Sequence, residues 1–147
     1  MSKENAGQRQ VVNNLFIKDS LRNFGYNGVL CGFEFEVTGN GYRGTYLSCV
    51  EGLSFELNGK PIGEDKIVFF INNKRFLLKQ LKELYAEYWY TTDSAIIRVY
   101  QDGGLAPGEY TIGYRIVTRM PYSGYFGSYR STESKETNTF ILNGSKK

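Results

Sequence analysis

Two glutamates in one strand-like segment come nearest, by type and spacing, to acid–base chemistry. Glu34 and Glu36 are two positions apart in the segment 29–37, in which apolar residues take the alternate positions. Side chains two apart on a strand share a face, so both carboxylates project the same way. Such a pair can act as acid and base in glycoside hydrolysis. A pair on an outward-facing polar stripe is more often solvated, so the pattern assigns no catalytic residue.

Composition excludes most other catalytic arrangements. The chain contains no histidine, the commonest general base and transition-metal ligand, so Ser-His-Asp and Cys-His arrangements cannot be built. The cysteine and acidic residues show no metal-ligand spacing, and no P-loop or EF-hand pattern occurs. We therefore expect no metal, no cofactor and no self-sufficient catalytic site on this chain.

Residues 39–44, GNGYRG, formally match the G-x-G-x-x-G pattern of dinucleotide-binding folds. That motif has to follow a strand and open a helix, whose N-terminus then holds the pyrophosphate. Here the chain continues as a predicted strand through Val50. We therefore interpret the segment as a glycine-rich hairpin.

An aromatic loop is the better candidate for binding. Pro121 interrupts strand pairing, and residues 121–130 contain four aromatic residues and two glycines. Tyrosine with nearby arginine is typical of protein interfaces, and aromatic rings also form sugar-stacking platforms. The alternative is a lid folded onto its own domain. The candidate substrate- or partner-facing residues are Arg119, Tyr122, Tyr125, Phe126 and Tyr129, with Arg43 and Trp89 as possible interface residues.

The elements that must position these residues are mostly strands. Alternating apolar residues predict strands at 15–17, 29–37, 42–50, 53–57, 67–71, 87–91, 95–101, 110–117 and 137–142, with residues 133–136 polar and exposed. Tight turns are expected at Asn27-Gly28, Asn58-Gly59 and Asn72-Asn73. Ile67–Ile71 is apolar on both faces, which predicts a central strand covered on both sides. Leu77–Tyr85 repeats at three and four and predicts one short helix.

These elements fit one all-β domain. A chain of 147 residues suits a single domain with a self-supporting core. Short strands with frequent turns and no βαβ alternation predict an antiparallel β-sandwich of immunoglobulin-like or jelly-roll type, with one short helix. Residues 13–142 should form this domain, between a polar N-terminal arm at 1–12 and a polar tail at 143–147. The net charge of +3 is too small to indicate nucleic acid or a membrane surface as a partner.

The sequence also predicts a compartment. The N-terminus is polar, without the apolar stretch of a secretory signal, and no apolar run approaches the roughly 20 residues of a membrane span. Cys31 and Cys49 lie in strand-like runs, which favours two buried free thiols over a disulfide. We therefore expect a cytoplasmic protein.

Five short motifs occur in an order that resembles the small β subunit of bacterial C-glycoside deglycosidases. They are Asp19–Asn23 (DSLRN), Gly32–Phe35 (GFEF), Tyr42–Gly44 (YRG) with Leu47-Ser48, Gly103–Glu109 (GGLAPGE) and Arg119–Tyr122 (RMPY). The glycine-rich turn and the Arg-x-x-Tyr spacing are the most specific of these motifs. The resemblance extends from about residue 19 to residue 142.

This resemblance implies a β-sandwich that pairs with a larger TIM-barrel α subunit, similar to sugar-phosphate isomerases. The α subunit would carry a divalent metal, usually manganese, and a histidine base. The substrate would be a C-glycoside whose sugar has been oxidised to the 3-keto form. Removal of the acidic C–H proton beside the ketone gives an enolate, and the aglycone carbon leaves by elimination. The resemblance assigns no catalytic residue to the β subunit.

Three functional hypotheses remain open from the sequence. The chain is the non-catalytic subunit of a C-glycoside-cleaving lyase, a free-standing carbohydrate-binding module with exposed aromatic residues, or a structural or adhesive β-sandwich. The second and third roles are mostly extracellular, so the polar N-terminus favours the first hypothesis. An isomerase-like protein encoded beside this chain would also favour it.

Overall fold

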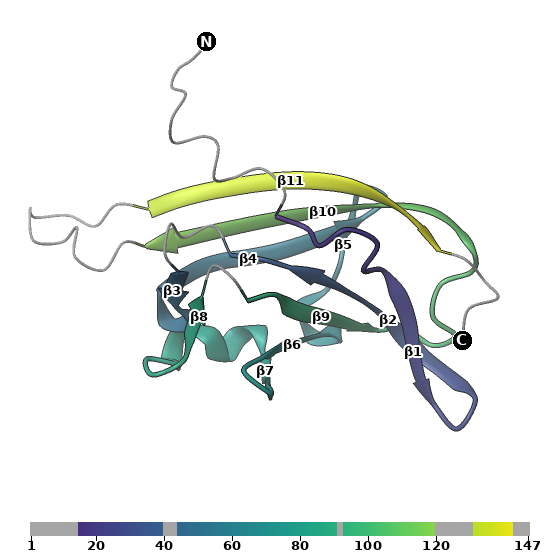
Figure 1. Cartoon of the computed structure of the whole chain (residues 1–147), viewed down its shortest axis with the longest axis horizontal. Coiled ribbons are helices and arrows are strands. Elements are labelled where there is room, and N and C mark those ends of the chain that lie inside the picture. Colours follow the sequence, from purple (N-terminus) through teal and green to yellow (C-terminus); the bar gives the residue numbers. More distant parts are fainter. Residues whose placement is uncertain (1–14, 40–43, 91–92, 120–130, 143–147) are drawn as a thin grey trace, which may run out of the picture.

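The computed structural model describes residues 15–39, 44–90, 93–119 and 131–142, which form an all-β sandwich, as predicted (Figure 1). Antiparallel sheets with strand orders β1-β2-β9-β6-β7 and β11-β10-β4-β5 form the two layers, and β3 pairs with β8 in a small third sheet. The strands are β1 (Arg22–Tyr26), β2 (Val29–Val37), β3 (Gly44–Tyr46), β4 (Val50–Leu57), β5 (Lys60–Pro61), β6 (Ile67–Ile71), β7 (Lys74–Leu77), β8 (Tyr88–Tyr90), β9 (Ala95–Tyr100), β10 (Gly108–Arg119) and β11 (Ser131–Leu142). The described helices are the 3-10 helices η2 (Leu47–Cys49), η3 (Glu64–Lys66) and η4 (Leu78–Glu83).

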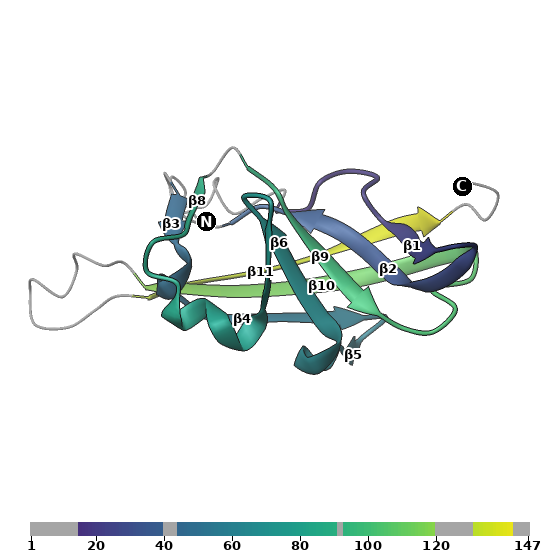
Figure 2. The ribbon, with the colours of Figure 1, turned by 90° about the horizontal axis from the view of Figure 1, so that it is seen from below.

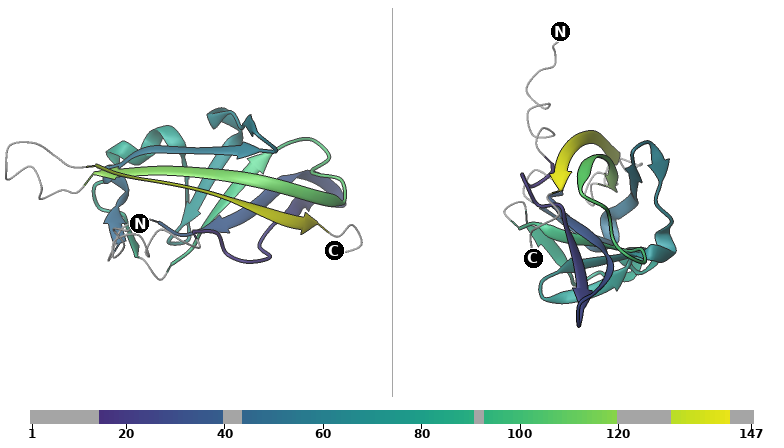
Figure 3. Two further views of the ribbon diagram at one scale, coloured as in Figure 1. Left: turned by 90° about the horizontal axis from the view of Figure 1, so that it is seen from above. Right: turned by 90° about the vertical axis from the view of Figure 1, so that its right-hand side faces the viewer.

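The two main sheets share one hydrophobic core. Strands β2, β9 and β6 lie across the long strands β10 and β11, as two further directions of view show (Figure 2, Figure 3). The ring of Phe55 on β4 packs between Phe35 on β2 and Tyr114 on β10, with centroids 5.4 Å and 5.1 Å apart. Aromatic pairs at such distances contribute about 0.5–1.5 kcal/mol beyond area burial. This packing fixes one sheet on the other.

The alternation in the sequence predicted the buried faces correctly. On β2, Phe33, Phe35 and Val37 are completely buried. Leu105, which precedes β10, is also buried in the core. Asn23 fixes its position: Leu105 N donates to Asn23 Oδ1 at 2.9 Å, and Asn23 Nδ2 donates to Leu105 O at 3.0 Å.

The three predicted tight turns are confirmed by their backbone angles. The pairs Asn27-Gly28, Asn58-Gly59 and Asn72-Asn73 all have positive φ at both residues. This is the requirement of a type I′ hairpin turn, and asparagine and glycine tolerate it best. These turns join β1 to β2, β4 to β5 and β6 to β7.

Several local predictions were wrong. Residues 133–136, expected to be exposed, lie within β11, which pairs with β10 along its whole length: Glu133 and Lys135 are exposed as predicted, but Ser134 is buried. The helix predicted at Leu77–Tyr85 is present, but it is shorter and is not an α-helix. It forms the tighter helix η4, in which Leu78 and Leu81 are buried at the spacing of three that suits a 3-10 helix. Strands β1, β5 and β7 were not expected.

Strand β6 is fully buried on one face only. It lies between β9 and β7, and Ile67, Phe69 and Ile71 point into the core. Val68 and Phe70 point to the opposite face and are half-buried. The sequence predicted burial on both sides, but the described part of the chain buries this strand fully on the inner side alone.

Candidate functional site

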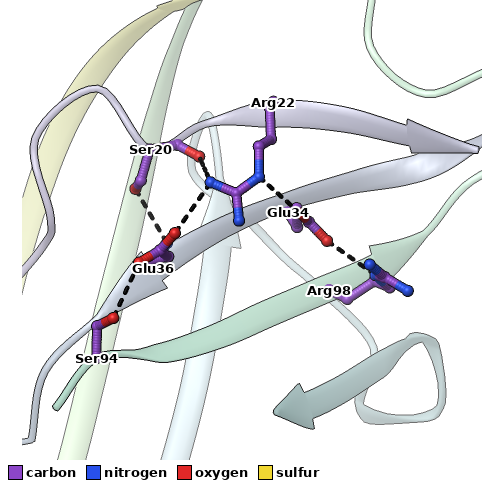
Figure 4. A network of polar contacts seen from close by, with 6 residues as sticks. All are labelled: Ser20, Arg22, Glu34, Glu36, Ser94 and Arg98. Carbon is purple, nitrogen blue, oxygen red and sulfur yellow. Dashed lines mark hydrogen bonds and ion pairs between the residues drawn. The ribbon is translucent and has the colours of Figure 1, made fainter. Parts of the chain in front are cut away.

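The outer face of the five-stranded sheet carries a network of ion pairs centred on Glu34 (Figure 4). Glu34 Oε2 lies 2.6 Å from Arg22 Nε, and Glu34 Oε1 lies 2.8 Å from Arg98 Nε. The strand register produces this arrangement, because Glu34 on β2 stands opposite Arg22 on β1 and Arg98 on β9. The Glu34 side chain is only 9% exposed, so the sequence interpretation of a solvated carboxylate was wrong.

Glu36, two residues further along β2, belongs to the same network. Its Oε2 lies 3.0 Å from Arg22 Nη1, and its Oε1 accepts a hydrogen bond from Ser94 Oγ at 2.9 Å. The backbone N–H of Glu36 donates to Ser20 Oγ. Partial burial opposes the positive charge of Arg22, but hydrogen bonds and charge from Glu34 and Glu36 outweigh it and raise the pKa of the guanidinium.

This network does not have the form of a catalytic acid–base pair. Each carboxylate already accepts a hydrogen bond from an arginine of the chain itself, and a general acid or base needs a group free to exchange a proton with substrate. Charged groups held in this way are costly to disturb and give a rigid, specific surface. We therefore interpret the network as the structural base of a binding face.

Aromatic rings enclose Arg98 on both sides. Its guanidinium carbon lies 4.2 Å from the ring centroid of Phe24 and 4.8 Å from that of Phe70. Tyr100 packs edge-on against Phe24, with ring centroids 5.2 Å apart. A cation stacked on aromatic rings gains about 0.5–2 kcal/mol per contact, depending on desolvation. Together with the half-buried aliphatic residues beside them, these side chains form the arginine–aromatic face: Phe24, Val68, Phe70, Ile96, Arg98 and Tyr100.

A second aromatic group lies on the small sheet. The rings of Tyr46 and Tyr90 each pack edge-on against Tyr88, at 4.8 Å and 4.7 Å between centroids, and both outer rings are exposed. The β6–β7 turn holds this strand, because Asn72 Nδ2 donates to Tyr88 O. Lys74 and Asn72 also donate hydrogen bonds to Glu87, and these bonds, that of Lys74 first, lower the pKa of the Glu87 carboxyl.

Trp89 does not lie on this surface, so its prediction as a possible interface residue was wrong. The indole is 1% exposed, packs edge-on against Phe69 at 5.2 Å between centroids, and donates from Nε1 to Asp93 O. The alternation along β8 was correct, but Trp89 faces the core and its two tyrosine neighbours face outward.

The structure places Arg119 at the last position of β10, half-buried. Its Nη1 lies 3.7 Å from Glu51 Oε2, and its Nη2 lies 3.8 Å from Cys49 Sγ, so its head group contacts the neighbouring part of the same chain. The other predicted site residues lie outside the described residues, so their contacts stay a prediction: Arg43, Tyr122, Tyr125, Phe126 and Tyr129.

The outer face of the four-stranded sheet differs in chemistry. Its outward residues on β10 and β11 include Thr111, Arg115, Thr137 and Thr139, and Arg115 Nε lies 2.6 Å from Glu133 Oε2. That ion pair lowers the pKa of the Glu133 carboxyl. An open hollow of about 410 Å³ over Gly113 is lined by Ser54, Glu56, Gly113, Tyr114, Arg115, Lys135, Glu136 and Thr137. This face is a polar, solvated surface.

Two further observations limit the chemistry. Within residues 15–39, 44–90, 93–119 and 131–142, no group of three or more cysteine or acidic residues is arranged to hold a metal ion. The same part of the chain contains no helix that is long and apolar enough to cross a bilayer. Both cysteines are free thiols, as expected, with Cys49 buried and Cys31 half-buried.

Sequence reasoning missed the arginine–aromatic face. One sign of it was Arg98, a charged residue in the middle of the apolar strand segment 95–100. Another was the run Ile67–Ile71, which is apolar on both faces although only one face meets the core. An arginine between aromatic and aliphatic residues is typical of protein interfaces.

Two comparisons with known proteins, one with protein families and one with individual proteins, indicate the same family. Residues 11–122 match the family described as C-glycoside deglycosidase beta subunit. A protein of Eubacterium cellulosolvens with the name C-glycoside deglycosidase beta subunit is 32% identical over 88 residues. The alignment covers 60% of this chain and 60% of that relative.

Proposed function

Since the chain belongs to the family of C-glycoside deglycosidase beta subunits, we propose that it is the non-catalytic subunit of a heteromeric lyase that cleaves the C–C bond of C-glycosides. The family match over most of the chain carries this proposal. A beta subunit implies an α subunit as its partner. The chain's own residues support a division of labour, because it has no histidine and because its best-placed carboxylates are bound to arginines.

The proposed reaction acts on a C-glycoside whose sugar carries a ketone at C3. A base removes the proton from the C–H beside the ketone, and the electron pair becomes an enolate. The enolate then expels the aglycone: the C–C bond breaks, its electron pair goes to the aglycone carbon, and that carbon takes up a proton. We assign the base, a histidine, and the divalent metal, expected to be manganese, to a TIM-barrel α subunit.

This chain would contribute binding surface to the complex. Its stable sandwich positions the arginine–aromatic face, and the predicted loop at residues 121–130 would help to form the mouth of the partner's active site. In this role the chain would change the affinity and turnover of the complex and would leave the bond-breaking groups to its partner. A cytoplasmic location fits this role.

One observation favours a second candidate, a free-standing carbohydrate-binding module. The exposed rings of Tyr46 and Tyr90 beside Tyr88 could stack on a sugar. However, the neighbouring rings are inclined by 80° and 65°, so they do not form one flat platform. Glycan binding by the isolated chain at micromolar concentration would favour this candidate over the subunit.

The proposed function is tested by co-expression with an isomerase-like α subunit from the same genome. We expect one co-eluting complex whose metal content follows the α subunit, and an isolated chain that neither binds stoichiometric metal nor cleaves a 3-keto C-glycoside. Elemental analysis and product chromatography measure both. Separate elution at micromolar concentration, or turnover by the isolated chain, would contradict the proposal.

A further inference from the structure

We propose that the arginine–aromatic face is the surface that docks onto the α subunit, and that the α subunit presents a carboxylate to Arg98 there. This inference deepens the proposed function and depends on it for the identity of the partner. It concerns only described residues: the face lies on strands β1, β6 and β9, and the charged residues around it add β2 and β7.

The first argument is that apolar side chains on the outer face of β6 are incompletely buried. A strand that is apolar on both faces is normally buried on both faces. Phe69 and its inward neighbours on β6 are buried, but Val68 and Phe70 on the other face are only half-buried. Ile96 beside Phe70 is also half-buried, and Tyr100 is 39% exposed. A partner that covers these side chains would complete the burial that the sequence pattern predicts.

The second argument is the contrast between the two outer faces. On the four-stranded sheet, the outward side chains are mainly threonine, glutamate, arginine and lysine. On the five-stranded sheet, aromatic and aliphatic side chains surround arginines. Aromatic residues and arginine are enriched in interfaces, while lysine and glutamate are depleted. The composition therefore selects the five-stranded sheet as the docking side.

The third argument is the preorganisation of Arg98. Its Nε donates to Glu34, and its guanidinium is enclosed by Phe24 and Phe70, so the side chain is held before any partner arrives. Among the described residues, the structure shows no hydrogen bond from its Nη atoms. A planar guanidinium held in this way can bind a carboxylate through those atoms at low entropic cost.

The fourth argument is charge complementarity. The outward-facing charged residues of this sheet are three arginines and two glutamates: Arg22, Arg75, Arg98, Glu34 and Glu36. Glu34 and Glu36 balance the charges of Arg22 and Arg98, with which they pair, so the positive charge in excess is that of the exposed Arg75, and burying it against a purely apolar partner would be costly. The complementary surface is therefore apolar with at least one acidic side chain. A second copy of this face would bring like charges together, which disfavours self-association.

The test replaces apolar residues by threonine on both outer faces, and the isoleucine of one face is matched by an isoleucine of the other. Ile96→Thr combined with Phe70→Thr removes apolar surface from the arginine–aromatic face. Ile141→Thr is the matched control, because Ile141 is 71% exposed on β11 of the other sheet. We expect the Kd for the purified α subunit to rise at least about 30-fold for the double variant, as for interface hot spots. For Ile141→Thr we expect a change within about 2-fold.

Arg98→Lys tests the carboxylate. Lysine keeps the positive charge but lacks the planar fork, so we expect the Kd to rise about 10-fold. Hydroxyl-radical footprinting of the wild-type chain avoids any effect on folding: the α subunit should protect Phe70 and Tyr100 and leave Ile141 reactive.

The outcomes separate this inference from the proposed function. If the wild-type complex forms but the double variant binds like wild type and Phe70 stays reactive, the docking surface is elsewhere. If the Arg98→Lys variant binds the α subunit like wild type, the proposal that the α subunit presents a carboxylate to Arg98 is wrong. If the chain forms a homodimer that the double variant dissociates, the occupant is a second copy. If no complex forms with wild type, the proposed function fails first, and this inference fails with it.

Discussion

Replacing Glu34 by glutamine should destabilise the chain although the change is nearly isosteric. Glu34 accepts two short charge-assisted hydrogen bonds, from Arg22 at 2.6 Å and from Arg98 at 2.8 Å. Removing one partner of a fully buried ion pair costs about 3–5 kcal/mol. Here the Arg22 side chain is 40% exposed and keeps Glu36 as a partner, so water and Glu36 reduce this cost. We expect a loss of about 2 kcal/mol for Glu34→Gln.

Urea denaturation followed by circular dichroism measures this loss, which corresponds to a fall in Tm of roughly 4–8 °C for a chain of this size. The matched control is Glu133→Gln, which breaks an Arg–Glu contact of the same length on the exposed face of the other sheet. We expect its unfolding midpoint to equal that of wild type. Equal midpoints for the two variants would refute the view that the Glu34 network is structural.

Two further changes test other parts of the account. Burial, and to a smaller extent the nearby charge of Glu136, raise the pKa of Tyr114. As the pH rises above about 10, the Tyr114 hydroxyl therefore loses its proton in the unfolded chain before it does so in the folded one. The free energy of unfolding should fall by about 1 kcal/mol between pH 10 and 11. Tyr114→Phe should remove that fall in urea titrations, whereas Tyr85→Phe, at an exposed position, should not; the same fall in both variants would contradict the assignment. Tyr125→Ala with Phe126→Ala tests the predicted loop: loss of affinity for the α subunit would place it at the interface, lost kcat/KM with intact affinity would place it at the substrate, and no change would make it an ordinary lid.

Local patterns in the sequence predicted the parts of the fold that local chemistry determines. Asn58-Gly59 turns the chain because both residues tolerate positive φ, and Phe33 and Phe35 are buried because a strand alternates its faces. The periodicity near Leu81 predicted a helix correctly, but it did not separate a 3-10 helix from an α-helix over so few residues.

Long-range pairing determined what the sequence could not show. Alternation places Glu34 opposite the core, but its burial depends on Arg22, 12 positions away, and on Arg98, 64 positions away. Trp89 alternates with its tyrosine neighbours, and a three-residue strand gives no local indication of which face meets the core. The arginine–aromatic face arises from β1, β6 and β9 together, so no single segment of the sequence contains it.

The most direct test of the central claim is reconstitution of activity from separate subunits. Increasing amounts of this chain are added to a fixed concentration of the purified α subunit, and aglycone release from a 3-keto C-glycoside is followed by chromatography. We predict low activity for the α subunit alone, none for this chain alone, and a rise that saturates at a fixed ratio of the two chains. An α subunit that is equally active with and without this chain would contradict its assignment as the accessory subunit.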